Sequence, residues 1–195
     1  MTETRAGLPI LAFADARAFA DWLTTNPKGA WLKFAKQGGG VATLSKSEAL
    51  DEALRHGWID GQLAKGDEAL FLVRFTPRRP GGRWSANNRA RAEALIAAGR
   101  MTPRGLAEVE AARADGRWRA AYPSASKAEI PEDFQAALRG SETAASAFAA
   151  LDGANRYAML YRLHHAKSGA QRTKMLQTFV AMLERGETIH PTRKV

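Results

Sequence analysis

The sequence contains no cysteine among its 195 residues. Disulfides, thiolate metal sites and a cysteine nucleophile are therefore excluded. Long apolar runs are also missing, because no stretch approaches the roughly 18 to 20 residues that a membrane-spanning helix needs. The segment from Met1 to Leu11 lacks the apolar core of a secretory signal. We therefore expect a cytoplasmic protein without a membrane span.

Histidine is scarce as well, with four residues at His56, His164, His165 and His190. His164 and His165 are adjacent, so on a helix they point about 100° apart and cannot share a metal as an i, i+4 pair does. We expect His164 to be packed or to cap its helix. His56 ends a predicted helix, where a cation meets the helix dipole favourably, and no suitably spaced nucleophile accompanies it. We expect no metal, no cofactor and no catalytic residue.

Basic residues are in excess, with a net charge of +9. The excess is uneven: residues 77–119 carry ten basic and four acidic side chains, and residues 156–195 carry eight and two. Such segments are typical of proteins that meet anions, including nucleic acid or an acidic membrane surface. A solvated arginine-rich surface without any ligand explains the same composition, and both interpretations stay open.

The front half of the chain predicts an α+β arrangement. A helix capped by Asp15 precedes a strand over residues 30–36, and Gly38 to Gly40 predict a plain loop. Ser45 and Glu48 form a capping-box pattern for a second helix, which Gly57 ends. Two strands over residues 58–63 and 70–76 then predict a hairpin. We expect a small, mostly antiparallel sheet with helices.

The back half predicts helices only. Ser85 caps the first, Thr102 and Pro103 open the second, and three later helices cover residues 131–138, 141–151 and 154–166. A final helix spans residues 171–185 with an apolar i, i+3, i+4, i+7 pattern. Residues 117–131 predict a linker and residues 188–195 a frayed tail. The expected domains are an α+β domain over 1–84 and a helical domain over 85–195, with their packing into one unit left open.

Two polar segments stand out around Trp58 and Trp84. Strand alternation places Trp58, Asp60 and Gln62 on one face. Arg74 shares that face if the hairpin register has the right parity, and its guanidinium then pairs with the Asp60 carboxylate. The sequence does not fix the register, so this pairing is conditional.

The segment after the second hairpin strand brings arginines to a helix start. Arg78 and Arg79 precede Trp84 and the cap residue Ser85, where unpaired amides and the dipole favour an anion. Asn88 lies on the apolar side of this helix and needs a polar partner. The hypothesis is a pocket for a small anion or phosphate. Its ligand-binding residues would be Trp58, Asp60, Gln62, Arg74, Arg78, Arg79, Trp84, Ser85 and Asn88. A purely structural strand-to-helix joint is the alternative.

Several blocks of the chain resemble the YdeI/OmpD-associated (OmdA, bacteriocin-protection) family. They are SKSEALDEALRHGWIDGQ over 45–62, FTPRRPGGRWSANN over 75–88, GRMTPRGLAEVEAARADGRW over 99–118 and AKSGAQRTKMLQTFVAMLERG over 166–186. Residues 168–171 depart from the expected Pro-Glu-Thr-like helix start. The resemblance implies an α+β front followed by helices. It implies no reaction, because the family names describe an association with envelope proteins or peptide resistance.

Three functions are consistent with the sequence. The favoured one is a cytosolic accessory or stress-related protein that binds an anionic partner without catalysis. An enzyme acting on a small anionic metabolite at Asp60 and Arg78 is the second. Non-specific nucleic-acid binding is the third, although no recognisable nucleic-acid-binding motif supports it. No feature of the sequence predicts the oligomeric state.

Overall fold

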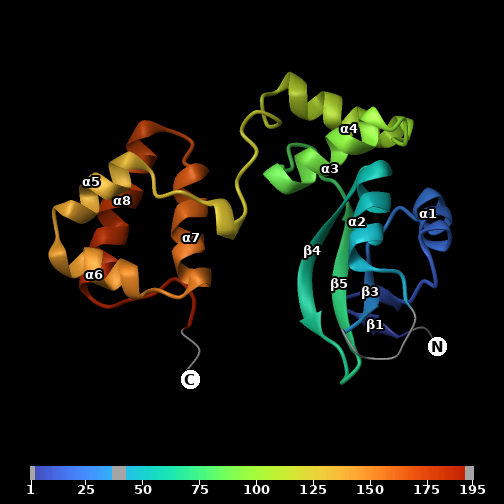
Figure 1. The fold of residues 1–195 in the computed structure, drawn as a ribbon, viewed down its shortest axis with the longest axis horizontal. Coiled ribbons are helices and arrows are strands. Elements are labelled where there is room, and N and C mark those ends of the chain that lie inside the picture. The colour runs from blue at the N-terminus through green and yellow to red at the C-terminus, as the bar shows by residue number, and fades with distance from the viewer. Residues whose placement is uncertain (1–2, 37–42, 192–195) are drawn as a thin grey trace. The chain divides into compact units, whose positions relative to one another are not determined.

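The computed structural model describes residues 3–36 and 43–191, so the predicted loop at Gly38 to Gly40 lies outside the described residues (Figure 1). The chain forms two compact units, Met1–Ala121 and Tyr122–Val195. This division falls inside the predicted linker 117–131 and differs from the predicted domain boundary at residue 84. The first two helices after residue 84 belong to the first unit.

The first unit contains a five-stranded sheet with the order β1-β2-β3-β5-β4. Its strands are β1 Thr4–Arg5, β2 Leu8–Leu11, β3 Ala30–Ala35, β4 Trp58–Lys65 and β5 Leu70–Pro77. Strands β1 and β2 were not predicted, because both are short and β2 contains Pro9. The β4–β5 hairpin was predicted at the position where it occurs.

The sheet is mixed, which corrects the expectation of a mostly antiparallel one. Strand β2 pairs with β3 in parallel, with Ile10 opposite Trp31, whereas the other three strand pairs are antiparallel. Parallel neighbours need a long crossover connection. Helix α1, Ala16–Thr25, supplies it between β2 and β3. The predicted α+β front and helical back are otherwise present.

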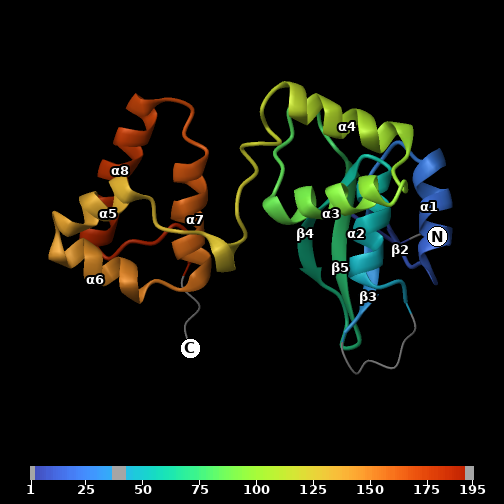
Figure 2. The same ribbon diagram turned by 45° about the horizontal axis from the view of Figure 1, so that its top comes forward.

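Helix starts in the first unit follow their predicted caps. Helix α2, Lys46–Arg55, carries the complete capping box of Ser45 and Glu48. Helix α3, Ala86–Ala97, is capped by Ser85, and helix α4, Pro103–Ala114, by Thr102. Figures 1 and 2 both show α3 and α4 beside the end of the sheet where β4 begins and β5 ends.

Two apolar clusters pack the helices of the first unit against its sheet and against one another. One lies between α1, α2 and one face of the sheet, and contains Phe19, Leu23, Ala53, Trp58 and Phe75. The other joins the end of α2 to α3 and α4. Because α1 and α2 cover one face, we call the opposite one the open face of the sheet.

The second unit is helical. Its helices are α5 Glu132–Arg139, α6 Glu142–Ala150, α7 Gly153–His164 and α8 Gly169–Glu184, preceded by the 3-10 helix η1 Ala125–Lys127. Helix α8 begins two residues before its predicted start, because Ser168 caps it by accepting a hydrogen bond from the backbone of Gln171. The four α-helices share one apolar cluster that includes Phe134, Phe148 and Phe179. None of the helices described is long and apolar enough to cross a membrane.

The described part of the C-terminal tail is fastened, although the sequence predicts fraying. Asn155 is fully buried, and its side-chain oxygen accepts a hydrogen bond of 2.8 Å from the backbone N–H of His190. Its amide nitrogen donates to the carbonyl of His190 at 3.2 Å. This pair of bonds ties residue 190 to α7.

Candidate functional site

The two polar segments of the predicted site meet in space. The backbone N–H of Arg78 donates a 3.0 Å hydrogen bond to the carbonyl of Gly57. The Arg78 guanidinium carbon lies 3.4 Å from the ring centroid of Trp84. Strand β4, the end of β5 and the start of α3 therefore form one joint.

The two tryptophans of this joint belong to the apolar clusters. Trp58 is fully buried and meets Trp22 edge-to-face with centroids 5.7 Å apart. Trp84 is 1% exposed and contacts Trp118 at 4.8 Å. Aromatic pairs of this kind stabilise a core beyond the burial of their area. Neither ring lines the open hollow described below, so both differ from the expectation that they line a ligand pocket.

The register of the hairpin separates Asp60 from Arg74, so the condition for the predicted ion pair is not met. Asp60 lies opposite Phe75, whose side chain faces the core under α1 and α2. Its carboxylate lies 3.8 Å from the Nζ atom of Lys46 at the start of α2. Arg74 points to the open face, because it lies opposite Trp31 and one residue away from Phe75.

A register shift between Asp60 and Leu63 explains why strand alternation failed here. Gly61 and Gln62 together oppose Arg74, so the strand bulges and Gln62 turns to the open face. Trp58 and Asp60 stay on the covered face. The three residues that the sequence analysis placed on one face are therefore divided between two.

An arginine-lined hollow of about 280 Å³ lies on the open face at this joint. Its wall contains Ile59, Asp60, Gly61, Gln62, Arg74, Thr76, Pro77, Arg78, Arg79, Gly82 and Arg83. Four of these carry a guanidinium and one carries a carboxylate, which lies near Lys46. Of the nine predicted residues, Asp60, Gln62, Arg74, Arg78 and Arg79 line this hollow.

The rim of the arginine-lined hollow is held by specific contacts. Arg78 is 8% exposed, lies flat on Trp84 and donates from Nη1 to the carbonyl of Arg83 at 3.3 Å. Arg117 donates from Nη1 to the carbonyl of Gly82 at 2.7 Å, and its Nε pairs with Asp115. The loop from 78 to 83 is therefore fixed from both sides, which limits the ordering entropy that a ligand must overcome.

Ser85 and Asn88 act in the helix cap. The Ser85 hydroxyl accepts a 3.1 Å hydrogen bond from the backbone N–H of Asn88, and Asn88 is buried. This is the N-cap that the sequence predicts, and neither residue contributes to the wall of the hollow. Both residues therefore serve to start α3 next to Trp84.

His56 belongs to a structural joint between α2 and α4. Glu52 is 4% exposed and binds Arg55 at 2.5 Å and Arg100 at 3.4 Å, with the His56 imidazole 4.0 Å away. Burial, with help from the charge of Arg55, lowers the pKa of His56 below its usual value, although Glu52 opposes this. These contacts stabilise the packing of α2 against the α3–α4 region.

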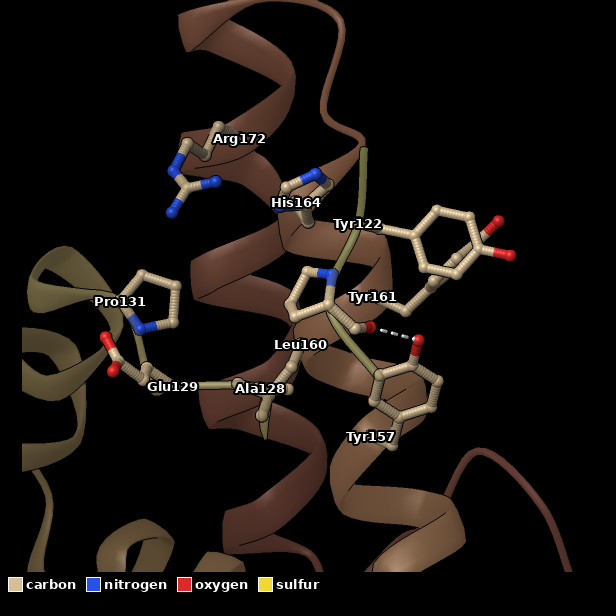
Figure 3. Close-up of a pocket in the computed structure, with 10 residues that line it drawn as sticks. Tyr122, Ala128, Glu129, Pro131, Tyr157, Leu160, Tyr161, His164 and Arg172 are labelled. Carbon is tan, nitrogen blue, oxygen red and sulfur yellow. Dashed lines mark hydrogen bonds between the residues drawn. The ribbon is translucent and has the colours of Figure 1, made fainter. Parts of the chain in front are cut away.

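A second cavity, which we call the tyrosine pocket, lies within the second unit (Figure 3). It has a volume of about 180 Å³ and is lined by Tyr122, Pro123, Ala128, Glu129, Pro131, Tyr157, Leu160, Tyr161, His164 and Arg172. The Tyr157 hydroxyl donates a 2.8 Å hydrogen bond to the carbonyl of Pro123. Burial, and the nearby phenols of Tyr122 and Tyr161, raise the pKa of Tyr157.

The charge at the mouth of the tyrosine pocket is largely neutralised. Arg172 binds Asp133 through Nε at 2.5 Å and Nη2 at 2.9 Å, and its Nη1 donates to the carbonyl of Leu163. This pairing lowers the pKa of Asp133. His164 is exposed at the mouth, whereas the sequence analysis expected it to be packed or to cap its helix. Tyr157, Tyr161 and His164 follow one another at i, i+4, i+7 on one face of α7, and this spacing, which suggested a packed His164, instead lines the pocket.

No group of three histidine or carboxylate side chains that could hold a metal ion occurs within residues 3–36 and 43–191. The chemistry of the arginine-lined hollow is that of charge-assisted hydrogen bonding to an anion. Guanidinium groups match phosphate and carboxylate oxygens with two parallel N–H donors.

Two family models match parts of the chain. Over residues 127–186 the chain matches the model of the family described as Bacteriocin-protection, YdeI or OmpD-Associated, which confirms the resemblance for the second unit. Residues 11–108 match the model of a domain of unknown function, DUF8412. Neither a curated protein nor a solved structure shows significant similarity to the chain. The DUF8412 model covers 98 of the 195 residues, so the chain belongs to the DUF8412 family. Its C-terminal region matches the OmdA model.

Proposed function

We propose that the chain is a non-catalytic binding protein that holds an anionic, phosphate-bearing partner in the arginine-lined hollow. One observation carries the proposal: four arginines line one hollow, whereas its single carboxylate lies near Lys46. Such an excess of positive charge in a concave wall concentrates field lines and attracts anions.

Arg74 is the central residue of this proposal. It stands in the middle of β5, between Val73 and Phe75 of the core, so its backbone is rigidly placed. Its Nε is buried without a hydrogen-bond partner within the described residues. Leaving a buried donor without a partner costs free energy. Because Arg74 as a whole is half-buried and lines the hollow, a turn of its guanidinium would bring this donor to a phosphate oxygen there.

The alternative of an enzyme at Asp60 and Arg78 is less well supported. The Arg78 guanidinium lies flat on Trp84, and the Asp60 carboxylate lies near Lys46. A general acid or base must reach the proton that it transfers. This arrangement favours binding over catalysis at that pair.

The wider role proposed here is that of a cytosolic accessory or stress-related protein. The description of the OmdA family names protection and association and no reaction, which supports an accessory role. The cytoplasmic location rests on the sequence alone.

Titration calorimetry with inorganic pyrophosphate tests the proposal. We expect binding to the wild type that weakens with added salt, because exposed charges are screened. Arg74→Gln should lower the affinity about tenfold, as loss of one charge-assisted hydrogen bond predicts. Arg17→Gln, which removes an exposed charge on α1, is the matched control and should bind as the wild type does. Equal affinities for all three proteins, or no heat at low salt, would overturn the proposal.

A further inference from the structure

The open face of the sheet carries a second basic hollow. It has a volume of about 370 Å³ and is lined by Glu3, Thr4, Arg5, Ile10, Lys33, Lys65, Gly66, Asp67, Leu70 and Leu72. Three of its side chains are basic and two are acidic. Glu3 and Lys33 neutralise each other at 2.9 Å, and Asp67 accepts the backbone N–H groups of Ala69 and Leu70, so Arg5 and Lys65 supply the positive charge of this hollow.

The two hollows adjoin along β5. Leu72 lines the second hollow and Arg74 lines the first. Residues i and i+2 of a strand point to the same face and lie roughly 7 Å apart. The hollows are therefore neighbours on one surface, which follows β5 from Leu70 to Arg78 over roughly 26 Å at 3.3 Å per residue.

A buried apolar cluster forms the floor of the second hollow. It consists of Ile10, Trp31 and Leu72, with Leu8 and Ala64 packed against them, and all five are strand residues. Trp31 is 4% exposed, and its ring lies 5.2 Å from the exposed guanidinium of Arg5. The Trp31 Nε1 atom donates to the carbonyl of Arg5 at 3.1 Å, which holds the two residues together. A guanidinium plane supported by an aromatic ring is a surface on which a nucleobase can stack.

We propose that the open face binds single-stranded nucleic acid, with phosphates in the two hollows and a base stacked on the exposed Arg5 guanidinium, which the Trp31 ring supports. The inference rests on the proposed function, because the arginine-lined hollow supplies one of its phosphate sites. It goes further by requiring the second hollow and the surface between them.

The basic hollows together with the Arg5 guanidinium select this ligand. An inorganic polyphosphate has no planar group to stack on Arg5. A duplex keeps its base faces inside the stack, so it can offer only phosphates to the sheet. A single strand presents both, and strand surfaces with aromatic and basic side chains are a known mode of recognition for single strands. A strand of about four nucleotides fits the 26 Å of β5, at roughly 6 to 7 Å per nucleotide.

Fluorescence anisotropy with labelled oligothymidylates of two, four and eight nucleotides tests the proposal. Affinity should rise steeply from two to four nucleotides and then level off. The double variant Arg5→Gln with Lys65→Gln removes two exposed charges of the second hollow. It should lower the affinity for the eight-nucleotide probe about tenfold and reduce the slope of log K against log salt by about 0.7 for each lost phosphate contact. Its affinity for pyrophosphate should stay at the wild-type value.

The matched control is the double variant Arg17→Gln with Lys28→Gln, which removes two exposed charges outside both hollows. It should bind the eight-nucleotide probe as the wild type does. Arg74→Gln should weaken both the oligonucleotide and pyrophosphate. Pyrophosphate binding with no dependence on oligonucleotide length would refute the single-strand inference and leave the proposed function standing. Equal affinity for a duplex, for polyphosphate of the same charge or for an acidic peptide would refute it as well.

Discussion

The close approach of α4 to the end of α2 gives the sharpest prediction for stability. A Cβ atom at Gly105 would lie 2.8 Å from the carbonyl carbon of Arg55 and nearer still to its oxygen, a distance that real structures do not show. The same oxygen accepts two hydrogen bonds from Thr102, at 2.6 Å from its hydroxyl and at 3.2 Å from its backbone N–H. Gly105→Ala must therefore push the two helices apart.

The magnitude follows from opposing terms. Overpacking costs about 1 to 3 kcal/mol, and weakening two hydrogen bonds to Arg55 costs about 1 kcal/mol each. Alanine in a helix recovers up to about 1 kcal/mol relative to glycine. We expect Gly105→Ala to lower the free energy of unfolding of the first unit by about 2 to 4 kcal/mol.

Tryptophan fluorescence during urea denaturation measures this change. All five tryptophans precede residue 122, so the signal reports the first unit alone. Gly153→Ala is the control, because a Cβ there meets no atom within 4 Å; it should leave the tryptophan-monitored transition unchanged. A Gly105→Ala protein that unfolds at the wild-type urea concentration would refute the described packing of α4 on α2.

Two further predictions concern buried polar groups. In the folded protein the pKa of His56 lies below the usual 6.5, so the unfolded chain binds more protons and the first unit loses stability as the pH falls below 6.5. His56→Gln should flatten this loss in urea titrations between pH 5 and 8. A variant with the wild-type pH profile would contradict the burial of this imidazole. Asn155→Ala removes the bonds to His190 and should destabilise the second unit by about 2 to 3 kcal/mol, measured by far-ultraviolet circular dichroism in denaturant. The exposed Asn87→Ala is its control, and equal midpoints for the two variants would show that the tail is not fastened.

Local features of the fold could be predicted from the sequence. The capping box of Ser45 and Glu48, the cap Ser85, and Thr102 followed by Pro103 all start helices where the sequence places them. Each is a short-range signal, because the cap side chain bonds a backbone N–H three residues away. The hairpin strands were found for the same reason, since their alternation is read within a few residues.

Features set by distant partners could not be predicted. Strand β2 has only four residues, and its pairing with β3 depends on the crossover through α1. The bulge at Gly61 and Gln62 follows from the pairing with Arg74, and one extra residue reverses the face of every side chain after it. The sequence therefore located the polar segments, but it placed Asp60 and Gln62 on the same face of the strand, whereas they lie on opposite faces. The tyrosine pocket was missed because residues 122–131, which form one of its walls, have no periodic pattern.

Chemical-shift mapping with inorganic pyrophosphate tests the central claim most directly. In a protein labelled with ¹⁵N, arginine Nε–H resonances report each guanidinium separately. The account predicts that Arg74 and Arg79 shift together with the backbone amide of Thr76, and that Arg17 does not move. Shifts of similar size at Arg17 and at arginines of the second unit, with none at Arg74, would contradict the account.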